Sequence, residues 1–287
     1  MKPKFTHDIV NSFFLWYDNF LMRKSDAYKS YTTKLYNYED ARLGGGKVVY
    51  GSPYKQWVFD RNVTGAIIPS GLTINGNFVT TGTSGLMFDF DNGRAIFNSG
   101  VAKTLNITGT YTVKEINSYI TDQPEDDLII EGKYIQNSRF TVQETYVPPY
   151  NPATPCSFIS LEHNFNQPFS FGGQDETVIK IKSVVFAENL YQLDGVLSTF
   201  ADSFNTCFKI VPMISHPLGE FSQLKTGLYP TGFDYTNAIT NGGYTNPCFI
   251  YNVDTSKIRD SVLKELNPTL HIGFIEFNIG NVRFPRI

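Results

Sequence analysis

The chain has 287 residues, enough for one large domain or two modest ones with a sizeable core. Charged residues make up 18% of it, below the roughly 25% usual in soluble globular domains. The formal net charge of −3 argues against a nucleic-acid reader, which would show clustered Lys and Arg. Aromatic residues make up 15%. Two alternatives fit this composition: a surface covered by other subunits, or a β-rich protein that covers its sheets with aromatic side chains.

The first predicted element is a helix over residues 8–23. Thr6 is its predicted N-cap, and Asp8 suits the first turn of a helix. Apolar side chains recur at spacings of three and four and form one broad face. They are Ile9, Phe13, Trp16 and Phe20, with an adjoining stripe of Val10, Phe14, Tyr17 and Leu21. This face is wider than a lone surface helix needs, so we expect it to pack on the body of the fold, or partly on a neighbouring subunit.

A β-rich block follows the Gly44-Gly45-Gly46 break. Runs of aromatic and β-branched residues predict strands at 48–50, 56–59 and 109–113. Asn75-Gly76 and Asn92-Gly93 each lie between alternating apolar residues. Because Asn-Gly adopts positive φ at both central positions, each pair predicts a hairpin with a two-residue turn.

The second half of the chain begins with the proline-rich run 148–155, which predicts a linker of polyproline geometry. An ordered arm that reaches a neighbour is the alternative. A strand is predicted at 177–186, followed by Asn189 as the N-cap of an amphipathic helix. The apolar face of that helix consists of Leu190, Leu193, Leu197, Phe200 and Phe204. Further strands are predicted at 208–211, 247–251 and 271–279, with a short helix at 256–266.

These elements predict an α+β protein: an N-terminal helix, a hairpin-rich antiparallel β-block and a C-terminal α/β portion with one long amphipathic helix. We divide the chain into 1–45, the helix and a connector; 46–147, the β-rich block; and 156–287, the α/β portion.

Motifs for catalysis, metals and cofactors do not have the required spacing. Gly44-Gly45-Gly46-Lys47 lacks the other Walker residues, so it predicts a turn. Asp89 and Asp91 open a calcium-like loop, but its glycine falls one place early and the twelfth position is Gly100, so we expect a hairpin with both carboxylates in solvent. The carboxylates at 122 and 125–127 indicate a solvated loop.

The four histidines show no metal-ligand spacing, and there is no GxSxG nucleophile motif. We therefore predict no catalytic residue, no metal and no cofactor. Cys156, Cys207 and Cys248 form no CxxC pair, and we expect buried, reduced thiols. The N-terminus lacks a signal-peptide pattern, and no apolar run approaches the roughly 20 residues that span a bilayer, so we expect synthesis in a cytoplasm and no membrane contact.

Residues 50–60, 84–97 and 186–198 resemble segments of uncharacterised virion structural proteins of tailed bacteriophages. In such virions, a strand followed by an amphipathic helix and more strands is similar to tail-terminator and head–tail connector subunits, which the portion 156–287 resembles. The resemblance implies a non-enzymatic subunit of a neck or tail-completion ring that joins capsid to tail and lets DNA through. It also implies other copies of the chain, other head or tail proteins and passing DNA as partners, made in the host cytoplasm and located in the virion.

The contacts of such a ring are expected on the N-terminal helix and the proline-rich segment. The candidate interface residues are Phe13, Trp16, Phe20, Tyr146, Pro148, Pro149 and Tyr150. A receptor-binding, baseplate or tail-fibre protein is the alternative, since it would also be β-rich and aromatic. A glycan-active enzyme remains a third class, and it would need two carboxylates at a fixed separation across a cleft.

Overall fold

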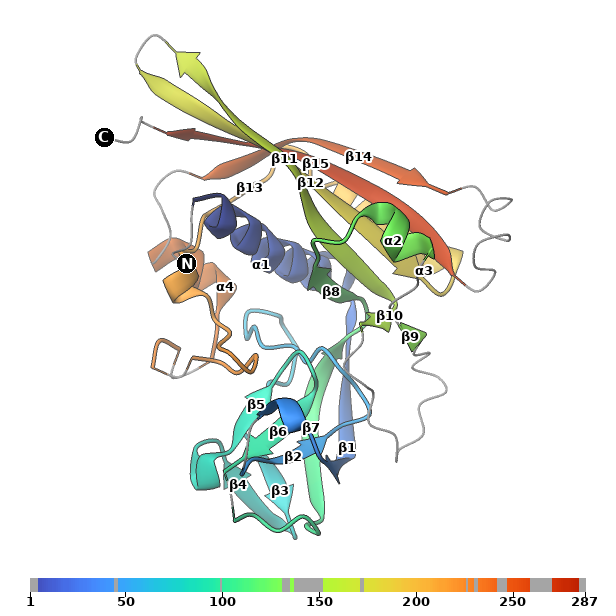
Figure 1. The fold of residues 1–287 in the computed structure, drawn as a ribbon, viewed down its shortest axis with the longest axis vertical. Coiled ribbons are helices and arrows are strands. Elements are labelled where there is room, and N and C mark those ends of the chain that lie inside the picture. The colour runs from blue at the N-terminus through green and yellow to red at the C-terminus, as the bar shows by residue number, and fades with distance from the viewer. Residues whose placement is uncertain are drawn as a thin grey trace.

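The computed structural model of the chain describes residues 5–43, 46–98, 100–130, 135–136, 152–170, 173–225, 227–229, 232–241, 247–258 and 270–283. These residues form a seven-stranded sheet, a six-stranded sheet and a two-stranded pair. In Figure 1 the six-stranded sheet lies at the top and the seven-stranded sheet at the bottom, with helix α1 (Phe5–Ser25) between them. The fold is therefore mixed and mainly β, in agreement with the coarse prediction.

The seven-stranded sheet has the order β4-β3-β7-β1-β2-β6-β5. Its strands are β1 (Tyr28–Tyr38), β2 (Val48–Gly51), β3 (Gly71–Ile74), β4 (Asn77–Thr80), β5 (Met87–Asp89), β6 (Arg94–Phe97) and β7 (Ile107–Lys114). The predicted strands at 48–50 and 109–113 are present. Strand β1 was not predicted: it pairs with both β7 and β2, although Leu35 is its one buried residue. Residues assigned to a connector thus form the centre of this sheet.

Both Asn-Gly hairpins are present, but only the first has the predicted two-residue turn. Asn75 and Gly76 have φ of 49° and 88°, and their neighbours Ile74 and Asn77 pair directly, as a two-residue turn requires. At Asn92-Gly93, β5 and β6 pair antiparallel as predicted, but Asp89 pairs with Arg94, so the connecting loop has four residues instead of two.

The loop 90–93 is lengthened because its polar groups bond to other parts of the chain. The backbone carbonyls of Phe90 and Asp91 accept from the N–H groups of Trp57 (2.7 Å) and Gln56 (3.0 Å). Neither carboxylate lies free in solvent: Asp89 is buried, and half-buried Asp91 accepts from the Ser222 hydroxyl at 2.7 Å.

The predicted strand at 56–59 is also corrected. Within it, a single β-bridge joins Trp57 to Val113. The Trp57 ring is fully buried and stacks on Tyr111, with the ring centroids 4.1 Å apart. The segment is apolar because it crosses the core as irregular chain, which the same residue pattern does not distinguish from a buried strand.

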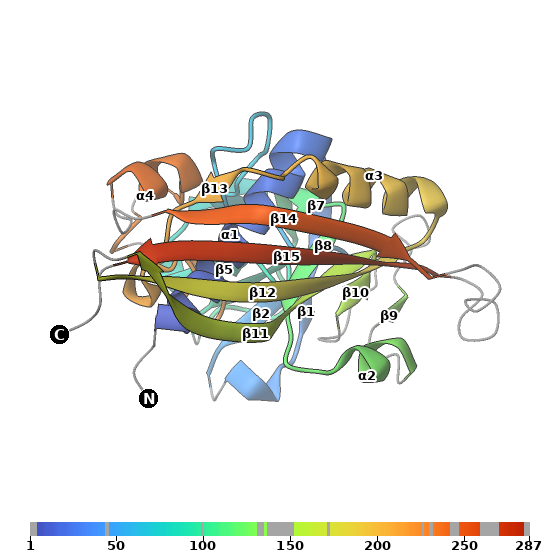
Figure 2. The ribbon, with the colours of Figure 1, turned by 90° about the horizontal axis from the view of Figure 1, so that it is seen from above.

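The six-stranded sheet has the order β13-β14-β15-β12-β11-β8. Its strands are β8 (Asn117–Ile120), β11 (Cys156–Ser170), β12 (Gln174–Ala187), β13 (Cys207–Phe208), β14 (Cys248–Lys257) and β15 (His271–Arg283). All neighbours are antiparallel except β8 and β11. Figure 2 shows β14, β15, β12 and β11 side by side from above. Because β8 comes from the predicted β-block, the sheet crosses the boundaries drawn from the sequence.

Helix α1 packs on the inner face of this sheet together with α3 (Leu190–Ala201). The Phe13 ring meets Phe277 edge-on at 4.9 Å, and Tyr17 stacks on Phe200 at 4.0 Å between ring centroids. The expectation that this face packs on the body of the fold is confirmed. Thr6 is not the N-cap, since the helix begins at Phe5.

Helix α3 begins as predicted, with the Asn189 side chain accepting from the backbone N–H of Gln192 at 2.9 Å. It ends earlier than predicted, so Phe204 lies outside it and is 53% exposed. Leu190 also faces solvent, because the buried stripe of α3 runs through Val196 instead.

Two more helices are short: α2 (Glu125–Ile130) and α4 (Tyr235–Asn241). The carboxylates at 125–127 form the first turn of α2 instead of a loop, because negative charge is favourable at a helix N-terminus. The helix predicted at 256–266 is wrong at its first two residues, because Ser256 and Lys257 belong to β14. Residues 259–266 lie outside the described ranges.

Other predictions hold in part. Of the predicted strand 208–211, only Phe208 is in a strand, β13. The predicted strand 247–251 begins one residue later, in the longer β14, and 177–186 and 271–279 are parts of the longer β12 and β15. Cys156 and Cys248 are buried as expected, and Cys207 is exposed.

In the proline-rich run, β10 (Ala153–Thr154) pairs with β9 (Ile135–Gln136) and packs on the protein itself. Asn117 Nδ2 donates to the Ala153 carbonyl at 2.7 Å.

Candidate functional site

The β11–β12 hairpin extends past the body of the protein, at the upper left of Figure 1. Strand β8 pairs with β11 only over residues 156–159, and residues 161–169 are all exposed. Among the described strands, none pairs with the outer side of β11 beyond this point. In the part of the chain that the structure describes, β11 therefore presents a long open edge.

The opposite side of the sheet is open as well. Strand β13 pairs with β14 only at residues 248 and 249, and Ile250 bonds to the backbone of Asn205 and Thr206. Within the described chain, the outer side of β14 has no strand partner over residues 251–257. Among the described residues, the six-stranded sheet is thus open at two different edges.

An aromatic row crosses the outer face of the sheet, opposite α1. Phe165, Val178, Gly280 and Phe249 are successive register partners on four strands. The Tyr251 ring lies over Gly280, where an added Cβ would be 3.6 Å from it. Phe165, Phe249 and Tyr251 are 43%, 50% and 43% exposed. Such a cluster of half-exposed aromatic side chains is typical of an interaction surface.

Charged side chains form the next rows of the same face. Lys180 Nζ lies 2.7 Å from Glu276 and 3.0 Å from Glu162. Two hydrogen bonds raise the pKa of Lys180: the one to Glu276 has the larger effect, and the one to Glu162 the next largest. Lys182 pairs with Glu125 of α2, at a cavity of about 310 Å³. Glu125 and Glu162 are thus partners of lysines, and the Lys182–Glu125 pair links α2 to the sheet.

A groove of about 1070 Å³ lies beside β5, between the segment 66–70 and the loop around Leu224. Its apolar lining is Ala66, Ile68, Pro69, Leu86, Met87, Phe88, Phe90, Leu224 and Tyr229. Arg61 and Lys225 add positive charge, and Arg61 lies 3.6 Å from Asp234. No Asp or Glu is among the described lining residues, so the two-carboxylate arrangement of a glycosidase is not found there.

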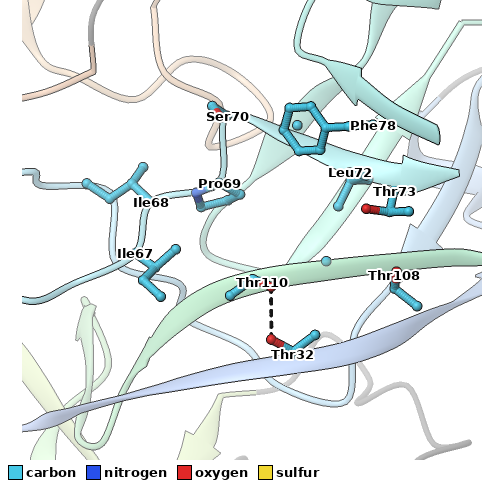
Figure 3. A pocket seen from close by; sticks show the side chains of 12 residues that line it. Thr32, Ile67, Ile68, Pro69, Ser70, Leu72, Thr73, Phe78, Thr108 and Thr110 are labelled. Atoms are coloured by element: carbon cyan, nitrogen blue, oxygen red, sulfur yellow. Dashed lines mark hydrogen bonds between the residues drawn. The ribbon is translucent and has the colours of Figure 1, made fainter. Parts of the chain in front are cut away.

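Figure 3 shows a smaller pocket, of about 230 Å³, which shares Ile68, Pro69 and Ser70 with the groove. Hydroxyl groups line its floor, and the Thr32 and Thr110 side chains hydrogen-bond at 2.9 Å. The Phe78 ring covers Gly71, where an added Cβ would be 2.7 Å from the ring. The pocket holds no titratable side chain among its described lining residues.

Buried ionisable groups lie in the interior, away from these cavities. Arg94 bridges Asp89 (2.7 Å) and Asp40 (2.5 Å), and all three are buried at the side chain. Burial lowers the pKa of Lys55 to about 8. Burial also raises the pKa of Asp60, opposed by N–H donors that include the Asn62 backbone. None of these groups lines the groove, and we interpret them as structural.

The candidate interface residues predicted from the sequence differ in burial, and some lie outside the described residues. Phe13 and Trp16 are buried within the chain, at 0% and 5% exposure, so their side chains are occupied by the core and we do not carry them forward as contacts. Phe20 is half-buried and lies 5.0 Å from Trp16 between ring centroids. The other four candidates, at 146 and 148–150, lie outside the described residues.

Sequence reasoning missed the two open edges. The exposed part of β11 is rich in Asn, Gln and His, which gives it a weak strand signal. Two features could have indicated this strand: Phe158 alternates with polar neighbours, and Phe165 and Phe169 are an even number of residues apart.

In the part of the chain that the structure describes, no group of three or more His, Cys, Asp or Glu is placed to hold a metal ion. No described helix has the length and apolar character to cross a membrane. No protein-family model matches the chain, and the curated proteins include no match to it.

Proposed function

We propose that this chain is a non-enzymatic structural subunit of a phage neck or tail-completion ring, which joins capsid to tail and lets DNA pass. The observation that carries the proposal is the six-stranded sheet with two different open edges, on β11 and β14. A closed ring needs two unlike surfaces on each copy, so that one surface meets the other on the next copy. Two unlike edges of one sheet supply that arrangement.

The surface chemistry supports a covered, multi-copy protein. Long open edges promote pairing with other chains, and monomeric proteins usually shield them. Here the exposed part of β11 carries the aromatic side chains Phe165 and Phe169. Together with the low charged fraction of 18%, this favours burial of the hairpin against a neighbour.

The placement in a virion rests on the resemblance of residues 50–60, 84–97 and 186–198 to tailed-phage structural proteins. DNA that passes through a ring should meet few basic side chains, since tight phosphate binding would impede its movement. The net charge of −3 is compatible with such a channel.

The proposal is tested by the assembly and the location of the native chain. We expect mass photometry and negative-stain images of the purified protein to show rings with a central opening. We expect antibody labelling of intact virions at the head–tail junction. Labelling at a distal fibre, or a trimeric spike in the images, would instead support the receptor-binding alternative; a persistent monomer would contradict a ring.

A direct test for catalysis accompanies it. The purified protein should leave a panel of bacterial surface glycans intact. Glycan hydrolysis that one carboxylate substitution abolishes would contradict the non-enzymatic assignment.

A further inference from the structure

We infer that the open edge of β11 in one copy pairs with the open edge of β14 in the next, so that neighbouring six-stranded sheets join into one continuous sheet. This inference rests on the proposed function, since it names the contact through which the ring forms. Its partner is a second copy of this chain.

The backbone of β14 has N–H and C=O groups that point away from β15, toward the open side. Ile258 N–H donates to the Ile272 carbonyl at 3.1 Å, so residue 258 points its backbone groups toward β15. In an antiparallel ladder this direction alternates from residue to residue. Asp254 and Ser256, the partners of Glu276 and Phe274, therefore also face β15. Val253, Thr255 and Lys257 consequently point their backbone N–H and C=O groups outward.

The same alternation identifies the free groups of β11. Thr121 N–H donates to the Ile159 carbonyl at 2.9 Å, so Ile159 faces outward and Ser160 faces β12. The register between β11 and β12 shifts at a bulge between residues 161 and 163. Beyond the bulge, His163 pairs with Lys180 and Phe165 with Val178, so the backbone groups of both β11 residues face β12. Asn164 and Asn166 therefore direct their backbone N–H and C=O groups to the open side. Pro168 lacks an N–H, which limits the pairing on that side.

Strand direction and side-chain faces also agree. β14 runs parallel to β12 and antiparallel to β11, because each adjacent pair from β14 to β11 is antiparallel. Copies repeated in the same orientation thus bring β11 beside β14 in an antiparallel sense. The open stretches 161–167 and 251–257 are equal in length.

The side chains of the outward-pointing residues lie on the same face in both strands. Asn164 is the partner of Ile179, and Thr255 is the partner of Ile275; both isoleucines are buried on the inner face. A pairing of Asn164 with Thr255 keeps the inner faces of the two copies continuous, whereas a shift by one residue would reverse them. Phe165 then lies opposite Asp254 on the outer face.

The contact also constrains the assembly. Traced through β12, the open stretch of β11 is level with the C-terminal half of β15, whereas the open stretch of β14 pairs with its N-terminal half. Successive copies are therefore offset along the strand direction. As in a β-barrel, closure requires the strands to tilt relative to the ring axis; without that tilt the same contact builds an open filament.

Engineered cysteine pairs test the contact directly. In a Cys207→Ser background, which removes the exposed native thiol, Phe165→Cys is combined with Asn252→Cys, Asp254→Cys or Ser256→Cys. These three positions cover the registers that keep the faces matched. We expect one combination to form disulfide-linked multimers on oxidation, because paired strands bring Cα atoms within about 7 Å. The matched control, Phe165→Cys with Thr255→Cys, places the thiols on opposite faces and should not cross-link.

Two outcomes overturn the inference. One is that none of the three combinations forms disulfide-linked multimers, so that all three give the same result as the control. The other is that Phe165→Cys alone yields a disulfide-linked dimer, which would indicate β11 pairing with β11 about a two-fold axis.

Proline variants give a second test that does not depend on oxidation. Asn164→Pro and Thr255→Pro each remove an outward N–H without breaking a bond inside the sheet. Each variant alone should be monomeric, because each has lost one of the two edges. Tm should change little, since Asn164→Pro removes only the exposed hydrogen bond from Asn164 Nδ2 to Thr6 Oγ1. Mixed, they should form a one-to-one heterodimer through their intact β14 and β11 edges. Wild-type-like assembly of either variant alone, or no heterodimer on mixing, contradicts the proposed contact.

Failure of the contact and failure of the function are distinguishable. Rings at the head–tail junction without the cross-links would leave the function standing and reject the contact. Cross-linked filaments, or cross-linked protein located at a fibre, would support the contact and reject the neck ring.

Discussion

Lys114 Nζ lies 2.8 Å from a carboxylate oxygen of Asp18, and both side chains are buried. Lys114 ends β7 of the seven-stranded sheet, whereas Asp18 belongs to α1 on the inner face of the six-stranded sheet. Lys114 also donates to Gln56 Oε1 at 3.4 Å and lies 5.1 Å from the centroid of the Phe59 ring. The pair therefore connects the two halves of the fold.

Asp18→Asn should destabilise the protein by about 3–5 kcal/mol, because it leaves the Lys114 charge buried without its partner. Urea denaturation measures this free energy of unfolding. The matched control is the exposed pair of Lys103 and Glu39, 2.7 Å apart, where Glu39→Gln should cause no measurable loss. An Asp18→Asn variant as stable as the parent would contradict the structural role of the pair.

Tyr17→Phe should cost about 1–3 kcal/mol, because the Tyr17 hydroxyl lies 3.0 Å from both the Ser157 and Ser183 hydroxyls, which are buried. Thermal or urea unfolding near neutral pH provides the measurement. Tyr191→Phe is the control, because Tyr191 is 89% exposed and its hydroxyl lies in solvent. Equal losses in both variants would count against the buried hydroxyl network.

Stability should also fall at alkaline pH. Burial raises the pKa of Tyr17 to about 12 and that of Tyr111 to about 12. The folded state therefore holds these protons more tightly than the unfolded state, whose tyrosine pKa is about 10. The contribution is complete below about pH 10 and is lost as the pH rises toward about 12. Urea unfolding across this range should show the decline, and Tyr17→Phe should reduce its slope; a flat profile would contradict it.

Two glycines should respond in opposite directions to alanine. Gly93 has φ of 62°, and an added Cβ would lie 1.8 Å from the Tyr54 carbonyl oxygen, so Gly93→Ala should be strongly destabilising. Gly195 lies inside α3 with nothing within 4 Å of an added Cβ, so Gly195→Ala should stabilise by up to about 1 kcal/mol. Denaturation midpoints compare the two, and a destabilising Gly195→Ala would contradict the open space at that position.

Asn189→Ala should destabilise by about 1 kcal/mol, since the Asn189 side chain accepts from the first turn of α3. Asn189→Asp keeps an acceptor at the same place and should retain most of the stability. The comparison of the two variants by urea denaturation separates the cap from general effects of the substitution.

The local signals in the sequence predicted the local structure well. The apolar period of α1, the turn at Asn75-Gly76 and the cap at Asn189 are all present. Each depends on residues within one or two turns of chain, so the amino acids concerned carry the necessary information. The coarse α+β class follows from the same signals.

The tertiary structure decided the strands whose partners are distant in sequence. Tyr28–Tyr38 is a central strand because β7 pairs with it, although its own pattern is mostly polar. Asn92-Gly93 has the same turn residues as Asn75-Gly76, but hydrogen bonds to Gln56 and Trp57 lengthen its loop. Phe13 and Trp16 are core residues because the six-stranded sheet covers them.

The candidate assembly surface is of the same kind. An open edge exists only because no described strand pairs with residues 161–167 of β11 or 251–257 of β14 on their outer sides, and this depends on the order of all the strands. The sequence by itself therefore determined helices α1 and α3, the cap at Asn189 and one two-residue turn, through short-range sterics and hydrogen bonding. Which strands became neighbours, and which edges stayed free, was decided by long-range pairing, since backbone hydrogen bonds carry no side-chain label of their partner.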